Sequence, residues 1–147
     1  MIQIRVMTIE DYDGVYDLWI STPGMGLNTT DDSREGIARY LRRNPTSCFV
    51  AEDGGKIIGV ILAGHDGRRG YIHHTAVLPE YRNKGAAKGL VEHAMEALDR
   101  EGINKAALVV FERNKTGNGF WEHIGFSARE DLVYRNKNIH DLVRIDT

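Results

Sequence analysis

One short stretch near the middle of the chain combines basic residues with a glycine that opens a helix. Arg82 and Lys84 precede Gly85, and Ala87 and Lys88 follow within the first helical turn. Unpaired backbone N–H groups and the helix dipole favour an anion at a helix N-terminus, and a glycine lets the chain approach that anion closely. The stretch therefore predicts an anion site, although a helix cap beside a solvated basic face would explain the same residues.

Two adjacent histidines lie on the strand expected before this turn. Histidine titrates near neutral pH, so it can accept a proton from a reacting group. Because successive strand residues face opposite sides of a sheet, His73 and His74 should not enter one cleft, and we expect His74 to face the core helices. Tyr71 should share the face of His73. A histidine that only packs or hydrogen-bonds remains the alternative for His73.

The hydrophobic pattern supplies the elements that would position these residues. Alternating and continuous apolar runs predict strands, and apolar residues at helical spacing predict helices between capping residues and glycines. Strands are expected at 2–6, 48–52, 56–64, 71–78, 106–111, from 126 onward and at 139–145. Helices are expected at about 9–20, 34–43, 85–101 and 115–124. This order predicts one mixed α/β domain over residues 1–147.

The composition of the chain limits the classes of protein to which it can belong. The chain has 147 residues, 41% hydrophobic and 27% charged, with a net charge of −2, so it offers no electrostatic case for nucleic acid. A basic surface formed by Arg68, Arg69 and residues 82–88 would be the alternative, but interleaved aromatic residues are sparse. No signal peptide and no apolar run of about 20 residues is present, which predicts a cytoplasmic protein without a membrane partner. The single cysteine, Cys48, should be a buried thiol beside a strand.

Two blocks of the chain resemble the signatures of the GNAT acetyltransferases. Arg82-x-x-Gly85-x-Ala87 matches the Q/R-x-x-G-x-G/A motif that holds the pyrophosphate of acetyl-coenzyme A in that family. The preceding A-V-x-P-x-Y-R is also typical of the family, and Asn114 with residues 120–126 resembles its N…FYxxxGF block. Residues 52–90 look similar to small bacterial ribosomal-protein alanine acetyltransferases. The order of elements is also that of the family, so the resemblance covers nearly the whole chain.

The resemblance implies a particular fold and cofactor site. The fold would be a central mixed, mostly antiparallel sheet of about seven strands flanked by about four helices. Its fourth and fifth strands, at 71–78 and 106–111, would splay apart to admit the pantetheine arm. Asn114 can equally be a simple helix N-cap. The residues expected to bind acetyl-coenzyme A are Val77, Leu78, Arg82, Asn83, Lys84, Gly85, Ala86, Ala87, Lys88, Asn114 and Trp121.

The same resemblance implies direct acetyl transfer to an amine. His73 is the expected base, because related serotonin acetyltransferases resemble this chain in having a strand histidine at that spacing. Trp121 stands where the family usually has the tyrosine that protonates the leaving thiolate, and an indole cannot act as that acid near pH 7. Tyr134 is the substitute candidate. Met25, Leu27 and Tyr71 are expected to line the acceptor pocket.

Several alternatives stay open. The departure at Trp121 also suits a non-catalytic acyl-coenzyme A-binding sensor. The acceptor can be a small-molecule or a peptide amine, and a homodimer is possible because sheet edges of this kind often pair. Histidines and acidic residues do not cluster at zinc-binding spacing, so no metal is expected.

Overall fold

The computed structural model describes residues 1–145, and its central element is a mixed sheet of five strands in the order β1-β3-β4-β5-β6. All neighbours in this sheet are antiparallel except β5 and β6, which are parallel. The strands are β1 (Ile2–Val6), β3 (Phe49–Asp53), β4 (Lys56–His65), β5 (Gly70–Val77) and β6 (Ala106–Ala107). The helices are α1 (Tyr12–Ile20), α2 (Arg34–Arg43), α3 (Ala86–Arg100) and α4 (Lys115–His123), with single 3₁₀ turns at Ile9–Asp11 and Pro79–Tyr81. The expected mixed α/β class is confirmed.

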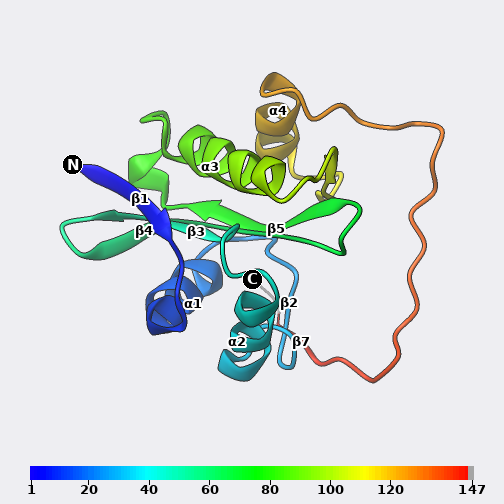
Figure 1. Ribbon diagram of the computed structural model, residues 1–147, viewed down its shortest axis with the longest axis horizontal. Coiled ribbons are helices and arrows are strands. Elements are labelled where there is room, and N and C mark those ends of the chain that lie inside the picture. Colours follow the sequence, from blue (N-terminus) through cyan, green and yellow to red (C-terminus); the bar gives the residue numbers. More distant parts are fainter. Residues whose placement is uncertain (146–147) are drawn as a thin grey trace.

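Helices cover both faces of this sheet, and each face has its own core (Figure 1). Leu90 and Ala94 of α3 are fully buried on one face. Val15 and Trp19 of α1, with Ile37 of α2, are buried on the other. Burying one such large side chain contributes about 1.5–3 kcal/mol. The two cores therefore hold β4 and β5, the central strands, in a fixed frame.

The C-terminal third differs from the sequence-based expectation. The strand expected over 106–111 pairs with β5 only at Ala106–Ala107, and the side chain of Val109 beyond it is 59% exposed. No strand forms between residues 126 and 143, and the last expected strand is reduced to β7 (Arg144–Ile145). This short strand pairs with β2 (Leu27–Asn28) in a separate two-stranded sheet. The described residues therefore form seven strands, but only five of them lie in the main sheet, and the expected single sheet is divided in two.

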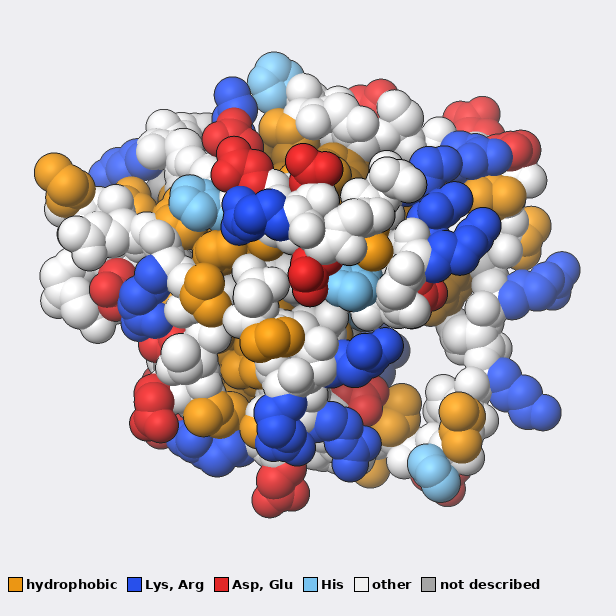
Figure 2. All heavy atoms as spheres, in the orientation of Figure 1, with side chains coloured by type: hydrophobic (Ala, Val, Ile, Leu, Met, Phe, Trp, Pro, Cys, Tyr) orange, Lys and Arg blue, Asp and Glu red, His pale blue; other side chains and the backbone are white. Residues whose placement is uncertain are grey.

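The physical reason is that an alternating pattern predicts a strand only where a neighbouring edge accepts its backbone hydrogen bonds. Residues 126–143 run outside the sheet, and in the space-filling view this part of the chain stands away from the body of the molecule (Figures 1 and 2). Leu132, Val133 and Ile139 in this segment are 61–92% exposed.

A bulge in β5 changes the direction of its histidines. Leu62 pairs with His73 and Val60 with Ala76, so β5 has one residue more than β4 across this interval. His74 has φ +46°, in the left-handed region that few non-glycine residues adopt. An inserted residue reverses the alternation of side chains, and the rings of His73 and His74 lie 6.1 Å apart, both next to the helices α1 and α2. The expectation that the two histidines face opposite sides is therefore wrong.

An ion pair ties the N-terminal strand to the first helical turn. The guanidinium of Arg5 donates to both carboxylate oxygens of Asp11, at 2.7 and 2.9 Å, and the backbone N–H of Thr8 donates to one of them at 2.9 Å. Burial would by itself raise the pKa of Asp11, but these hydrogen bonds outweigh it and lower the pKa below its usual value. The side chain of Arg5 is 41% exposed, so solvent weakens the pair.

Asp11→Asn should destabilise the protein near neutral pH more than in acid. A carboxylate with a lowered pKa stabilises the fold above its unfolded pKa of about 3.9, and this contribution is lost as the pH falls through the folded value. We expect a loss of about 1–2 kcal/mol at pH 7 in urea unfolding, shrinking steadily below about pH 4. Asp13→Asn, at an exposed pair with Arg34, is the control and should cost less. A loss for Asp11→Asn that does not change with pH would contradict this account.

Candidate active site

The turn before α3 has the geometry of an anion site. Asn83 (φ +61°) and Gly85 (φ +82°) both have left-handed backbones. The N–H groups of residues 83–88 donate to no acceptor within residues 1–145, and helical pairing begins with the N–H of Gly89 on the carbonyl of Gly85 at 2.9 Å. Successive unpaired amides at the positive end of a helix dipole form a concave site for an anion.

Side chains around this turn leave room and add positive charge. A Cβ on Gly85 would meet no atom within 4 Å, so the space beside its Cα is open. Arg82, Lys84 and Lys88 are exposed. The ammonium of Lys84 lies 5.4 Å from the Tyr81 ring centre, and that of Lys88 lies 3.9 Å from a carboxylate. Arg82 has no ion-pair partner in the described part of the chain, so its charge is available to a ligand.

The strands β5 and β6 part beside this turn. They pair only where Gly70 and Tyr71 face Ala106 and Ala107, after which β5 continues to Val77 and residues 108–111 leave the sheet. The edge of β5 that faces away from β4 therefore has no strand partner along most of its length. The hydroxyl of Thr75 on this stretch is the one buried side-chain oxygen or nitrogen in residues 1–145 that has no hydrogen-bond partner. An orphaned buried hydroxyl beside a free strand edge is a ready contact for a bound ligand.

A cavity of about 1760 Å³ lies between α3, α4, residues 104–110 and the segment after α4. Tyr71, Lys88, Trp121 and Tyr134 all line it. This volume exceeds the ~300–1,000 Å³ typical of sites for drug-sized ligands. The cavity lining does not include the turn at 82–87, although Lys88 connects the two.

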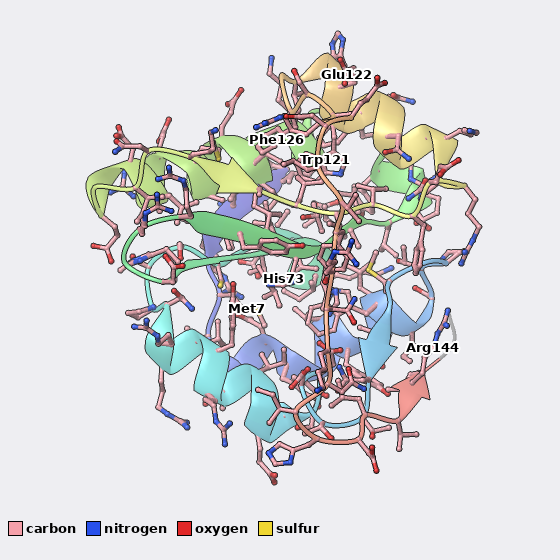
Figure 3. The ribbon with its side chains drawn as sticks, turned by 90° about the vertical axis from the view of Figure 1, so that its right-hand side faces the viewer. Met7, His73, Trp121, Glu122, Phe126 and Arg144 are labelled. Carbon is pink, nitrogen blue, oxygen red and sulfur yellow. The ribbon has the colours of Figure 1, made fainter. Side chains whose placement is uncertain are left out.

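His73 lies on the other side of the sheet from Trp121 (Figure 3). Its ring centre is 4.6 Å from that of Tyr71 and 6.0 Å from that of Tyr40 on α2. Loss of hydration in this packing lowers the pKa of His73, and nearby His74 lowers it further. His73 is nevertheless exposed to solvent. The imidazole is therefore neutral at pH 7 and accessible to a substrate.

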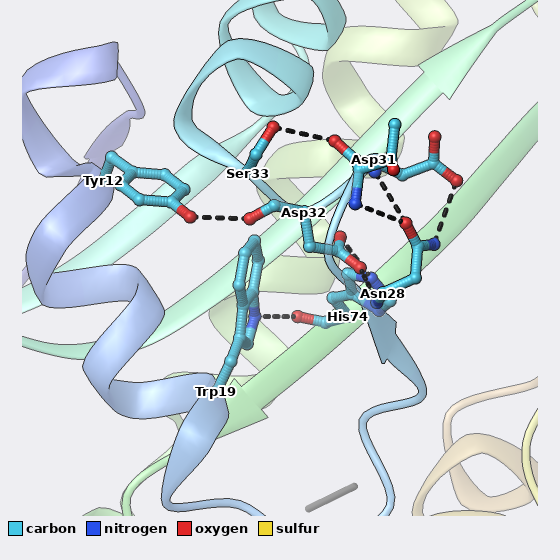
Figure 4. A network of polar contacts seen from close by, with 8 residues as sticks. Tyr12, Trp19, Asn28, Asp31, Asp32, Ser33 and His74 are labelled. Carbon is cyan, nitrogen blue, oxygen red and sulfur yellow. Dashed lines mark hydrogen bonds and ion pairs between the residues drawn. The ribbon is translucent and has the colours of Figure 1, made fainter. Parts of the chain in front are cut away.

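His74 forms a buried pair with a residue far away in sequence (Figure 4). Its Nε2 lies 2.8 Å from Oδ1 of Asp32, which is 4% exposed. The backbone N–H of Asn28 donates to the other oxygen of Asp32 at 2.9 Å. Trp19 Nε1 donates to the carbonyl of His74 at 3.0 Å, and the hydroxyl of Tyr12 donates to the carbonyl of Asp32 at 2.6 Å. These contacts join α1, the loop before α2, and the bulge of β5.

Hydrophobic periodicity gives no indication that these two residues meet. Asp32 precedes α2 but does not cap it, because the cap is Ser33, whose hydroxyl accepts the N–H of Gly36 at 3.0 Å. The available signal was the run of polar residues His73, His74 and Thr75, which breaks the alternation expected of a regular strand.

The remaining residues that the sequence predicted for the site lie in different surroundings. Leu27 is 1% exposed and belongs to a core cluster, so the structure makes it a core residue and the expectation that it lines a pocket is wrong. Met25 is partly buried against the same cluster. Asn114 caps α4, with its Oδ1 accepting the N–H of Gly117 at 2.9 Å, which leaves its Nδ2 for a ligand. Tyr134 is 66% exposed on the segment outside the sheet.

Cys48 does not contribute to this site. It is 1% exposed, and its thiol contacts the carbonyl of Ala63 at 3.3 Å. Burial raises the pKa of this thiol to about 12, so it stays protonated, and the expected buried thiol is confirmed. Within residues 1–145 no three histidine, cysteine or acidic side chains gather as metal ligands would. No helix in this part of the chain is both long and apolar enough to cross a membrane.

Comparisons with known proteins agree with this architecture. The model of the acetyltransferase (GNAT) family matches residues 12–126. An acetyltransferase of Pectobacterium atrosepticum is 29% identical over 139 residues, which cover 95% of this chain and 97% of that protein. The PaiA N-acetyltransferase of Thermoplasma acidophilum, solved with coenzyme A, has a TM-score of 0.77 at 19% identity, covering 98% of this chain and 97% of its own. The ribosomal-protein-S18-alanine N-acetyltransferase of Escherichia coli has a TM-score of 0.67 at 20% identity, covering 85% and 77%. The chain belongs to the GNAT family of acetyltransferases.

Proposed function

We propose that this protein transfers the acetyl group of acetyl-coenzyme A directly to an amine in a ternary complex. The observation that carries the proposal is the run of unpaired amides at 83–88, beside the edge of β5 that β6 leaves free. A diphosphate can accept hydrogen bonds from these amides, and an extended pantetheine arm can hydrogen-bond the free edge of the strand. Family membership supports acetyl transfer, and the coenzyme A in the PaiA structure supports this cosubstrate.

Each part of the coenzyme has a partner in the proposed complex. The amides at 83–88 and the charges of Arg82, Lys84 and Lys88 bind the diphosphate. Backbone groups near Val77 and Leu78 pair with the pantetheine arm. Asn114 contacts the arm through Nδ2, and Trp121 packs against the coenzyme from the cavity wall. The hydroxyl of Thr75 lies next to the free edge and hydrogen-bonds the acyl end.

The proposed transfer forms a bond between the amine nitrogen and the acetyl carbon and breaks the bond between that carbon and sulfur. His73 takes the proton that the amine loses, because its neutral imidazole is exposed on the face of α1 and α2. The coenzyme A thiolate leaves toward the cavity, where Tyr134 or water supplies a proton. Tyr71 borders both sides, since it lines the cavity and its ring packs on His73. It therefore lies between the amine and the thioester.

The acceptor is a primary amine, of a small molecule or a peptide. Met25, in the loop between α1 and α2, and Tyr71 are the proposed side chains that contact it. The name of the structurally similar Escherichia coli enzyme points to a protein alanine as one acceptor in this fold.

Thiol release from acetyl-coenzyme A, followed with DTNB against a panel of primary amines, tests the proposal. We expect release that depends on the amine, together with calorimetric binding of coenzyme A. Binding of the coenzyme without release for any amine would instead favour the sensor domain that Trp121 permits.

His73→Ala should lower kcat/KM by at least the ~10²-fold typical of lost general-base catalysis. The pKa of His73 is lowered, so the wild-type rate should rise with pH below about 6.5 and then reach a plateau. The variant should lose this acidic limb, which a pH–rate profile of thiol release measures. His140→Ala, at an exposed histidine on the segment outside the sheet, is the control and should keep the limb. An unchanged profile for His73→Ala would remove the assignment.

A further inference from the structure

We propose that Asp32 and His74 are a positioning pair that gives the two histidines different roles. His74 contacts the buried carboxylate of Asp32, and His73 remains free to take the proton of the amine. This inference rests on the proposed function and names two further residues for it. It assigns Asp32 and His74 no contact with substrate. They act through His73.

The buried carboxylate of Asp32 needs a hydrogen-bonding partner. Its carboxylate is 4% exposed, and His74 is its one ion-pair partner within residues 1–145. A buried carboxylate is stable only when it is paired and hydrogen-bonded. The amide of Asn28 occupies one oxygen and leaves the other facing the imidazole of His74 at 2.8 Å. His74 therefore supplies the contact that this buried carboxylate needs.

The bulge of β5 brings this pair close to His73. In a regular strand, neighbouring side chains point to opposite faces and the sheet separates them. At φ +46°, with its carbonyl held by Trp19, His74 instead turns toward the side of His73, and the two rings are 6.1 Å apart. Left-handed backbones at residues other than glycine concentrate at functional sites, where the surrounding structure holds them.

The two imidazoles have different surroundings. His73 faces Tyr71 and His74 on its own strand, Tyr40 on α2, and Asp31 and Asp32 before α2. Nearby His74 lowers the pKa of His73, whereas Asp31 and Asp32 raise it. His74 has a carboxylate in direct contact, whereas His73 has aromatic rings. The contact with Asp32 occupies the imidazole of His74, so His73 is left as the base.

The experiment follows the acidic limb of kcat/KM for amine acetylation in a series of variants. His74→Asn is the first, because asparagine tolerates a left-handed backbone and offers an N–H donor to Asp32. It removes the imidazole that lowers the pKa of His73 and keeps the negative charge of Asp32 that raises it, so the limb should move to higher pH by on the order of 1 unit. Adding Asp32→Asn to this variant removes that charge and should move the limb back to lower pH. His73→Gln should abolish the limb.

The opposite directions distinguish a charge effect from a structural one. If the pair only braces the loop, both substitutions lower kcat or the melting temperature while the limb stays in place, and the inference is overturned. A limb that moves the same way at both steps also overturns it. His140→Asn is the matched surface control, and His74→Gln replaces His74→Asn if the latter does not fold. If the wild type releases no thiol with any amine, the proposed function is overturned and this inference with it. If an active His74 variant keeps the acidic limb at the same pH, only the inference is overturned.

Discussion

Gly85→Glu should abolish the binding of coenzyme A, whereas Gly102→Glu should leave it intact. A carboxylate at position 85 would lie beside the amides of 83–88, where the diphosphate is proposed to bind. Two like charges about 4 Å apart repel by about 4 kcal/mol at an effective dielectric constant of about 20. That repulsion corresponds to an affinity about 10³-fold weaker. Because a Cβ at Gly85 meets no atom within 4 Å, a steric clash does not explain such a loss.

Gly102 provides a matched control at the other end of the same helix. Its φ is +80° against +82° for Gly85, and its Cβ position is equally open. Both substitutions therefore carry the same backbone cost of about 1–2 kcal/mol for a left-handed residue. Isothermal titration calorimetry with coenzyme A measures the affinities, and thermal unfolding shows that both variants fold. Equal losses in the two variants, or an unchanged affinity for Gly85→Glu, would mean that the diphosphate does not bind at the start of α3.

The parts of this protein that the sequence predicts well are the parts set by local chemistry. The helix α3 follows from apolar residues such as Leu90 and Ala94 at helical spacing, and the structure buries both. The turn before it follows from Gly85, whose left-handed backbone opens the helix, because such a turn needs only residues adjacent in sequence. The buried thiol of Cys48 likewise follows from its position next to an apolar strand.

The parts that the sequence misses depend on contacts between distant segments. Asp32 and His74 meet across 42 positions, and they meet only because β5 is bulged. Ile72 and Val77 belong to the same core cluster although they are an odd number of residues apart, which a regular strand forbids. The bulge would be evident if one knew which face of the sheet each side chain occupies, but the hydrophobic pattern alone does not give that information. In the same way, the alternating pattern after Phe126 does not show whether any sheet edge is available to pair with that segment.

Replacing each of the two tryptophans of this chain by alanine should affect a different property. The loss at Trp19 should be in stability, and the loss at Trp121 should be in affinity for coenzyme A. Trp19 is fully buried, and its indole N–H holds the carbonyl of His74 at the bulge. Trp19→Ala opens a cavity in the core and leaves that carbonyl without its partner, so it should cost about 3–5 kcal/mol. In a domain of this size each kcal/mol lowers the melting temperature by roughly 2–4 °C, so thermal unfolding should show a fall of at least about 6 °C.

Trp121 is only partly buried, packs against Phe120 and Phe126, and lines the cavity beside α4. Trp121→Ala should therefore melt well above Trp19→Ala and lose affinity for coenzyme A instead, measured by the same calorimetry. Trp19→Phe separates the two contributions at the first position, since it keeps most of the packing and removes the N–H donor. A melting temperature for Trp19→Ala within about 2 °C of the wild type would show that the bulge does not depend on α1. If Trp121→Ala melts as low as Trp19→Ala, its indole is a core residue and not a wall of the coenzyme site. The comparison thus tests separately the frame that fixes β5 and the cavity in which the coenzyme is proposed to lie.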